Sequence, residues 1–321
     1  MSKKKLKLGI IYGGRSQERD VSLHTAQQVI KFLDKKKYSI VPIEIAKDGS
    51  WPKTIKLDKL QAQIDLAFIA MHGPFGEDGT MQGFFETLGI PYTFSGVLAS
   101  SLAMDKSRSQ QLLSSLAIKV PESILFTRYS VLHNPTAVLR DIKNFGKIII
   151  VKPNRLGSSV GVHKIENKPQ VVLKALKDVL KYDVNVLVQR FITGWEITAP
   201  VLGNDQPKAL PLIEIIPKAK DSTFYDYASK YEEDGSDHII PAKLPKNLTK
   251  EIQNIAILAH LTFGCLGVSR SDFIVTANQE IYYLETNTIP GMTSTSLLPQ
   301  SAAKVGIGFS KLLDTIIRLA L

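Results

Sequence analysis

The stretch that decides the fold lies near the end of the chain, where residues 282–294 read YYLETNTIPGMTS. Its apolar first half predicts a strand, and Glu285 and Asn287, two residues apart, should point from one face of it. The apolar run 272–275 comes just before, and the turn between the runs predicts a hairpin that brings Asp272 close to both side chains. Two carboxylates and a carboxamide with no nearby His or Cys suit a hard cation such as Mg²⁺. A solvated strand end is the alternative interpretation.

The size and composition of the chain indicate an ordinary globular protein of two or three domains, because its 321 residues are 44% hydrophobic and 22% charged. No apolar run approaches the ~20 residues of a membrane span, and the first residues lead directly into a short strand. We therefore expect a cytoplasmic protein with no membrane partner. Cys265 is the only cysteine, which excludes an internal disulfide, and its apolar neighbours predict a small core residue.

The net charge of +10 raises the question of nucleic-acid binding, since clustered Lys and Arg neutralise phosphates. The basic runs at 3–5 and 35–37 are short, and the sequence has neither basic-aromatic alternation nor zinc-finger spacing. We therefore expect no nucleic-acid partner. The same charge balance suits an enzyme whose substrates are anionic nucleotides and carboxylates.

The first third of the chain predicts an open α/β domain with a mostly parallel sheet, ending near residue 96. An apolar strand at 6–12 leads through a loop containing Glu18 to a helical pattern at 21–33. A second buried strand at 66–71 ends at His72, which begins the polar, glycine-rich stretch HGPFGEDG. Polar residues at the carboxyl ends of strands mark the edge where open α/β sheets bind ligands.

The middle of the chain predicts a hairpin that could contact phosphate. A strand at 146–153 contains Lys152, the loop 154–161 reads NRLGSSVG, and a short strand follows at 162–164. The loop glycines allow backbone amides to approach phosphate oxygens closely, and the serine hydroxyls and nearby lysines add donors. An ordinary turn is the alternative.

Further elements follow from local patterns. They are helices at 97–116 with a break at 105–107, at 169–180 and at 250–263, strands at 184–192, 268–275 and 280–285, a β-rich stretch at 201–216, and two helices within 297–321. The polar loop 222–231 carries three tyrosines and predicts a mobile lid over a site.

Seven blocks of this sequence, in order, resemble those of the D-alanine–D-alanine ligases, ATP-grasp enzymes that make the dipeptide end of the peptidoglycan precursor. The blocks are GGRSQERDVSL at 13–23, His72-Gly73 with GEDG at 76–79, MDK at 104–106, Lys152-Pro153 with GSSVG at 157–161, FYDY at 224–227 with Lys230-Tyr231, Arg270 with Asp272, and ETNTIPGMT at 285–293. The resemblance covers the whole chain.

The resemblance implies an α/β (α+β overall) fold with three-domain ATP-grasp architecture. The expected domains are 1–96 with an open α/β sheet and the first D-alanine site, 97–188 with the Gly/Ser hairpin, and 189–321 with the metal site and the tyrosine loop. The implied reaction joins two D-alanine molecules through an acyl phosphate and releases ADP and phosphate. The expected cofactors are ATP and two Mg²⁺ ions, for which Mn²⁺ can substitute, and the expected assembly is a homodimer.

The resemblance also implies roles for individual residues. The metal ligands would be Asp272, Glu285 and Asn287. The nucleotide contacts would be Lys106, Lys152, Ser158, Ser159, Gln189, Arg190, Ile192 and Glu196. The catalytic set would be Glu18, Ser158, Tyr231, Arg270 and Gly291, and the amino-acid contacts Glu18, His72, Lys230, Arg270, Ser296 and Leu297.

Two positions depart from the family pattern. Relatives often carry a glutamate where this chain has Gln189, although an amide oxygen can still accept the hydrogen bond from adenine. They often carry a lysine at the position of Gln110, which weakens any role for that residue. Tyr231 favours a D-alanyl-D-alanine product, because relatives with phenylalanine there tend toward D-alanyl-D-lactate. The alternatives are a depsipeptide or other ATP-grasp ligase, or a non-catalytic nucleotide- or nucleic-acid-binding protein.

Overall fold

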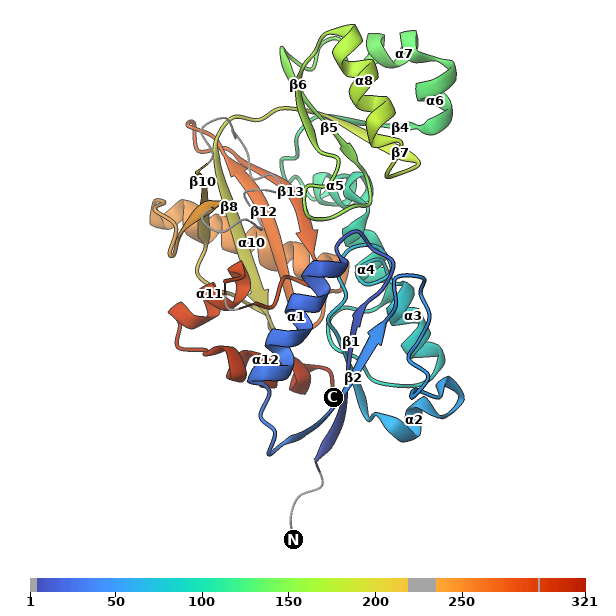
Figure 1. The fold of residues 1–321 in the computed structure, drawn as a ribbon. Coiled ribbons are helices and arrows are strands. Elements are labelled where there is room, and N and C mark those ends of the chain that lie inside the picture. Colours follow the sequence, from blue (N-terminus) through green and yellow to red (C-terminus); the bar gives the residue numbers. More distant parts are fainter. Residues whose placement is uncertain (1–4, 219–234, 294) are drawn as a thin grey trace.

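Three β-sheets and the helices around them make up the described part of this computed structural model, which covers residues 5–218, 235–293 and 295–321 (Figure 1). The tyrosine loop, including Lys230 and Tyr231, lies outside the described residues. The sheets follow one another along the chain, and the last helices return to the first sheet.

The N-terminal sheet is parallel, with strand order β2-β1-β3, and confirms the predicted open α/β unit. Its elements are β1 (Leu6–Gly13), α1 (Arg19–Phe32), β2 (Tyr38–Ile45), the 3-10 helix Leu57–Lys59, α2 (Leu60–Gln63), β3 (Leu66–Ile69) and α3 (Thr80–Thr87). The sequence did not predict β2, which contains Pro42 and Glu44. An edge strand tolerates both, because one of its sides has no strand to pair with.

The central sheet is antiparallel, with strand order β4-β7-β5-β6. Its elements are β4 (Ser123–Thr127), α6 (Arg128–His133), α7 (Pro135–Asp141), β5 (Ile148–Pro153), β6 (His163–Glu166), α8 (Pro169–Val179) and β7 (Asn185–Arg190). The pairing of β5 with β6 confirms the hairpin predicted around the Gly/Ser loop. The apolar face of α8, with Val172 and Leu176, packs on Ile149, Val151 and Val188 of the sheet.

The C-terminal sheet is the largest, with strand order β11-β10-β8-β12-β13 and the short β9 paired to β8. Its strands are β8 (Trp195–Leu202), β9 (Lys208–Ala209), β10 (Ile213–Pro217), β11 (Ser236–Ile239), β12 (Val268–Val275) and β13 (Ile281–Asn287). Three helices cover one face: α4 (Val97–Met104), α5 (Lys106–Ser115) and α10 (Lys246–Phe263). The predicted break between α4 and α5 is confirmed, and the Asp105 side chain caps α5 by accepting the Arg108 N–H at 3.1 Å.

The chain end joins the C-terminal sheet to the N-terminal unit. Helices α11 (Leu297–Lys304) and α12 (Phe309–Leu319) confirm the predicted helix pair, and α12 lies beside α1 (Figure 1). Leu313 and Ile316 of α12 belong to the same buried cluster as Leu8 and Ile10 of β1. This packing sets the loops after β1 and β3 opposite the polar ends of β12 and β13.

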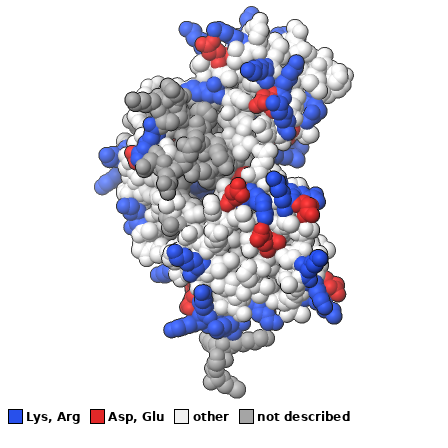
Figure 2. All heavy atoms as spheres, in the orientation of Figure 1, with Lys and Arg blue, Asp and Glu red and all other residues white. Residues whose placement is uncertain are grey.

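One face of the molecule carries its charges in a mixed pattern. On the face shown in Figure 2, Lys and Arg side chains are scattered, and several lie beside Asp or Glu. None of the described helices is both long and apolar enough to cross a bilayer.

Cys265 is buried in the core, as its apolar neighbours predicted, and is 3% exposed. Burial raises the pKa of the thiol to about 12, so the thiolate is scarce near neutral pH. A structural role follows, and no nucleophilic chemistry is assigned to this residue.

His260 makes the stability of the fold depend on pH. It is fully buried in α10, with Nδ1 2.7 Å from Ser269 Oγ and Nε2 3.0 Å from the Gly203 carbonyl oxygen. Burial lowers the pKa of its imidazole from 6.5 to about 4. In the unfolded chain the imidazole takes up a proton near its ordinary pKa, while the folded chain resists it. The stability that the neutral His260 side chain contributes is therefore fully present above the pKa of the unfolded state. It is lost as the pH falls toward the pKa of the folded state.

We expect the free energy of unfolding, measured in urea, to fall by up to about 3 kcal/mol between about pH 7 and about pH 4, since one pKa unit corresponds to about 1.4 kcal/mol. His260→Gln should flatten this dependence, whereas the exposed His133→Gln should leave it unchanged. Equal pH dependence in wild type and His260→Gln would contradict the assignment.

Candidate active site

The polar ends of β12 and β13 form a row on one face of the C-terminal sheet. Asp272 pairs in register with Glu285, and Arg270 pairs with Asn287. The intervening Ser271 points to the opposite face, where its hydroxyl lies 2.7 Å from that of the buried Thr286. The predicted hairpin is thus confirmed, and Asp272, Glu285 and Asn287 share a face as alternation requires.

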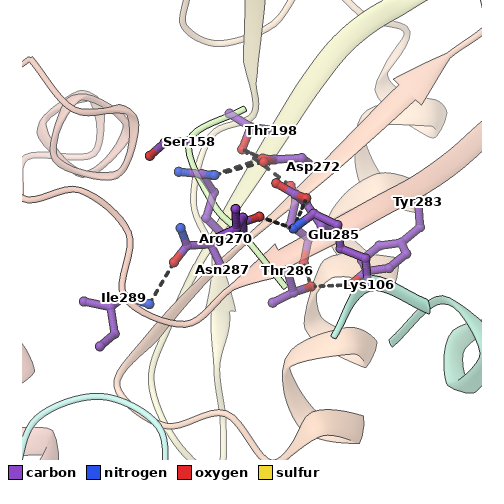
Figure 3. Close-up of polar contacts among 12 residues, drawn as sticks. Lys106, Ser158, Thr198, Arg270, Asp272, Tyr283, Glu285, Thr286, Asn287 and Ile289 are labelled. Carbon is purple, nitrogen blue, oxygen red and sulfur yellow. Dashed lines mark hydrogen bonds and ion pairs between the residues drawn. The ribbon is translucent and has the colours of Figure 1, made fainter. Parts of the chain in front are cut away.

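Cationic side chains hold the two carboxylates (Figure 3). Arg270 donates to Asp272 through two bonds, from Nε at 3.0 Å and from Nη2 at 2.9 Å. Lys106 at the start of α5 reaches across with Nζ 3.2 Å from Glu285 Oε2 and also donates to the Leu156 carbonyl at 2.6 Å. Thr198 of β8 donates its hydroxyl proton to Asp272. Acidic oxygens and their counter-cations therefore meet at one point between the central and C-terminal sheets.

The donor set of this row fits a hard cation. Within the described part of the chain, no cluster of three His, Cys, Asp or Glu side chains is placed to hold a metal ion. The candidate set is instead two carboxylates and the Asn287 amide, whose oxygen also accepts the Ile289 N–H at 2.8 Å. Oxygen donors of this kind, completed by water and phosphate, are what Mg²⁺ takes in nucleotide sites. The residues therefore fit the ion that the resemblance implies.

The loop after β13 forms a second group of donors. Ser296 stands at the N-terminal end of α11, and its Oγ accepts the Thr293 N–H at 3.1 Å. A β-carbon at Gly291 would lie 2.9 Å from that Oγ, so only glycine fits there without displacing the serine. The free N–H groups at a helix start attract carboxylates, which makes Ser296 and Leu297 suitable to bind an amino-acid carboxylate.

Glu18 joins the N-terminal unit to the central hairpin. Its side chain is 5% exposed and accepts the hydroxyl proton of Ser158. A β-carbon on Gly73 would lie 2.3 Å from Glu18 Oε1, and one on Gly157 would lie 2.8 Å from it. Two loops, one from the N-terminal sheet and one from the central sheet, thus approach one buried carboxylate, and glycines make that approach possible.

His72 is fixed by two partners in the wall beside Glu18. Its Nδ1 lies 3.2 Å from Glu77 Oε1 and its Nε2 lies 2.8 Å from Thr25 Oγ1, and its ring is 3% exposed. Glu77 also accepts the Gly73 N–H at 3.1 Å. The resemblance implied a role for His72 but for neither of these partners, although Glu77 lies in the GEDG block.

The larger cavity, of about 380 Å³, brings these groups together. Its lining includes the predicted residues Glu18, His72, Ser158, Arg270, Glu285, Asn287, Gly291, Ser296 and Leu297. This wall presents acids, bases and amide donors in a space sized for small polar molecules. Lys230 and Tyr231, predicted for the same site, lie outside the described residues.

The smaller cavity, of about 130 Å³, lies between the central and C-terminal sheets. Its lining includes the predicted residues Lys106, Lys152, Ser159, Gln189, Arg190, Ile192, Glu196 and Asp272. Apolar side chains of Ile150, Ile274 and Leu284 complete its walls. A cavity lined by apolar side chains and by two lysines suits a flat base attached to phosphates. The guanidinium of Arg190 pairs with Glu122, with Nη2 at 2.8 Å from Oε2.

Glu285 and Gly157 line both cavities. A ligand in the smaller cavity and one in the larger would therefore meet beside Glu285. Ser158 and Ser159 of the hairpin above have φ angles of 52° and 58°, in the left-handed region that few non-glycine residues adopt. Such strain is often retained at ligand-binding turns.

Several lining residues were not predicted. Helix α1 contributes His24, Thr25 and Gln28, whose spacing of three and four places them on one helical face, so the polar stripe itself was the signal. His238 also lines the larger cavity, with Nδ1 2.9 Å from Gln300 Oε1, and Gln300 donates to the Thr295 carbonyl at 2.9 Å. No sequence pattern connects His238 to the loop after β13, because the strand pairing that brings it there is not local.

Comparison with known proteins gives matches along the whole chain. A family model described as D-ala D-ala ligase C-terminus matches residues 112–318, and one described as D-ala D-ala ligase N-terminus matches residues 7–62 and 52–95. A relative from Desulforamulus reducens, named D-alanine–D-alanine ligase, is 43% identical over 98% of this chain and 99% of its own length. A relative of the same name from Syntrophobacter fumaroxidans is 43% identical over 100% of this chain and 99% of its own.

Solved structures show the same overall arrangement. VanG D-Ala:D-Ser ligase from Enterococcus faecalis superposes with a TM-score of 0.84 at 33% identity, covering 99% of this chain and 100% of its own. D-alanine–D-alanine ligase from Bacillus anthracis complexed with ATP superposes with a TM-score of 0.82 at 34% identity, covering 98% of this chain and 97% of its own. The similarity therefore extends over all three sheets.

Proposed function

The chain belongs to the D-alanine–D-alanine ligase family, and from this premise we propose that it joins two D-alanine molecules into D-alanyl-D-alanine while ATP is converted to ADP and phosphate. The curated relatives carry the name of that activity, which does not favour the D-lactate alternative. The single observation that carries the proposal for the site is the shared border of the two cavities at Glu285. There a nucleotide phosphate and an amino-acid carboxylate would come into contact.

The smaller cavity is assigned to ATP. Lys106 and Lys152 would neutralise the phosphates, and the hairpin at Ser158 and Ser159 would cover the γ-phosphate. Gln189 and the backbone of Arg190 and Ile192 would contact the adenine, with Glu196 on the ribose. Phosphoryl transfer depends mainly on such positioning and charge neutralisation.

The larger cavity is assigned to the two amino acids. Glu18 would hold the ammonium of the first D-alanine, with His72 near its carboxylate. An oxygen of that carboxylate forms a bond to the γ-phosphorus while the bond from phosphorus to the ADP oxygen breaks, which gives an acyl phosphate. Ser296 and Leu297 would bind the carboxylate of the second D-alanine through the N-terminus of α11.

The second step forms the peptide bond. The ammonium of the second D-alanine gives a proton to solvent, and the free amine attacks the acyl carbon to form the new C–N bond. The tetrahedral oxyanion would accept hydrogen bonds from Arg270 and the Gly291 N–H. It collapses as the bond from the acyl carbon to the phosphate oxygen breaks, so that inorganic phosphate leaves and the nitrogen gives a second proton to solvent. Lys230 and Tyr231 remain sequence-based assignments to this site.

Asp272, Glu285 and Asn287 are proposed as ligands of two Mg²⁺ ions, or of Mn²⁺ in their place. When bound, the ions would neutralise charge on the transferring phosphate.

We further propose the domain limits 1–96, 97–188 and 189–321, a homodimer, a cytoplasmic location, and no membrane or nucleic-acid partner. The buried clusters cross these limits, since α4 and α5 pack on the C-terminal sheet and α12 packs on the N-terminal one.

The decisive experiment measures phosphate release from ATP by the purified protein. We expect release to require D-alanine, to stop when EDTA removes the divalent cation, and to return with Mg²⁺ or Mn²⁺. Mass spectrometry of the product should show D-alanyl-D-alanine, with D-lactate and D-serine offered as competing acceptors. A folded protein that releases no phosphate in response to D-alanine, or that binds DNA in a salt-dependent way without turnover, would overturn the proposal.

A further inference from the structure

Two glutamines form a buried pair at the wall of the smaller cavity. Gln110 of α5 is 1% exposed and Gln189 of β7 is 3% exposed, and only Gln189 lines the cavity. The Gln189 Nε2 lies 3.0 Å from Gln110 Oε1, and the Gln110 Nε2 lies 2.7 Å from the Leu284 carbonyl oxygen of β13. One helix and two strands from different sheets thus meet through two amides.

The direction of this chain of hydrogen bonds is fixed at one end. A backbone carbonyl only accepts, so Gln110 must turn its NH₂ group toward Leu284. Its own oxygen then faces Gln189, and the Ser123 hydroxyl approaches the same oxygen at 3.5 Å. Gln189 must therefore donate to Gln110, which leaves the Gln189 oxygen for the cavity. No side chain or backbone group of the described residues donates a hydrogen bond to that oxygen. The oxygen is not fully buried, because Gln189 lines the cavity.

Reversing the Gln189 amide would disturb the whole pair. The amide oxygens of Gln189 and Gln110 would then face each other and repel. If Gln110 turned to remove this repulsion, its oxygen would face the Leu284 carbonyl oxygen instead. A buried acceptor without a donor is costly. The Gln189 side chain is therefore held with its oxygen toward the ligand. That oxygen can accept a hydrogen bond from a donor on the ligand but cannot bond to another acceptor.

We propose that Gln110 is a positioning residue that orients the Gln189 amide and so makes the base pocket select a purine with an amino group at position 6. This inference rests on the proposed nucleotide site. Adenine presents a donor there, whereas hypoxanthine and guanine present a carbonyl oxygen that would oppose the Gln189 oxygen. Gln110 exerts the selection without contacting the nucleotide.

The test is the ratio of kcat/KM for ATP to kcat/KM for ITP. Gln110→Met keeps the length of the side chain and removes both amide partners, so Gln189 becomes able to turn. We expect the ratio to fall by about tenfold or more, since discrimination by a hydrogen-bonding site depends on its fixed polar groups. The matched control is Gln111→Met, the neighbouring exposed residue on α5, which should keep the wild-type ratio.

A double variant separates orientation from mere structural support. In Gln110→Met with Gln189→Glu, the two carboxylate oxygens are equivalent, so either orientation offers an acceptor to the base. We expect this variant to recover preference for ATP over ITP, which a general loss of packing at Gln110 would not produce. A wild-type ratio in Gln110→Met, an equal fall in Gln111→Met, or no recovery in the double variant would overturn the inference.

Binding measurements keep this inference separate from the ligase reaction. If the wild-type protein shows no D-alanine-dependent turnover, calorimetric titration with ATP and ITP gives the same ratio from the dissociation constants. Thermal melting of each variant checks that it is folded. Equal affinity of wild-type protein for the two nucleotides would then reject the orientation even though the pair is present.

Discussion

Arg270→Ala is expected to lower kcat for dipeptide formation by about 100- to 1000-fold, the usual loss when one donor to a developing oxyanion is removed. The guanidinium is held in place by two hydrogen bonds to Asp272, at 3.0 and 2.9 Å, so its remaining N–H groups have a fixed direction. Preorganised donors stabilise a transition state without further rearrangement, which is why we expect the loss mainly in kcat. Phosphate release at saturating ATP and D-alanine measures it.

Arg270→Lys distinguishes geometry from charge. A lysine keeps the positive charge but cannot pair with Asp272 through two parallel bonds. We therefore expect activity well below wild type and above that of Arg270→Ala. The exposed Arg318→Ala on α12 is the control for removal of one basic side chain, and it should retain wild-type kcat. Unchanged kcat in Arg270→Ala, with the fold verified by melting, would remove this residue from the mechanism.

Local periodicity accounts for the strand geometry that was predicted in this region, whereas the roles of Lys106 and Arg270 came from the family resemblance. Alternation along a strand places Glu285 and Asn287 on one face, and a short turn between two apolar runs leaves little freedom in how Asp272 approaches them. The break at 105–107 between α4 and α5 could be predicted as well, because aspartate, here Asp105, is a favourable N-cap residue. In each case the deciding interaction lies within a few residues along the chain.

What could not be predicted depends on packing between distant segments. The family resemblance grouped Glu18 with Ser158, but no local pattern placed Gly73 and Gly157 against Glu18, since that contact needs two sheets in their final positions. Gln110 was discounted because it departs from the family pattern, yet its bond to Leu284 spans 174 residues of sequence. The position of His238 in the lining of the larger cavity was not predicted for the same reason. Non-local hydrogen bonds leave no periodic trace in a single sequence.

Glu18→Gln is expected to lower kcat/KM for D-alanine by about 10- to 100-fold, because a hydrogen bond to a charged group contributes about 1.5 to 3 kcal/mol. The carboxylate is buried beside the N-terminal end of α1, and the amide that replaces it has no charge to offer an ammonium group. The KM for ATP should change less, since Glu18 lines only the larger of the two cavities. Initial rates with each substrate varied in turn separate the two effects.

Gly157→Ala tests whether Glu18 also connects the two cavities. The added β-carbon would lie 2.8 Å from Glu18 Oε1 and 3.2 Å from Oε2, so either the hairpin or the carboxylate must move. Because Gly157 borders both cavities, we expect this variant to weaken D-alanine use, as Glu18→Gln does, and to raise the KM for ATP as well. Gly308→Ala, where an added β-carbon meets no atom within 4 Å and φ, as at Gly157, lies outside the left-handed region, is the control for replacing a glycine without a clash. If Gly157→Ala affected only ATP, the hairpin would act on the nucleotide without Glu18, and the carboxylate would serve the amino acid alone.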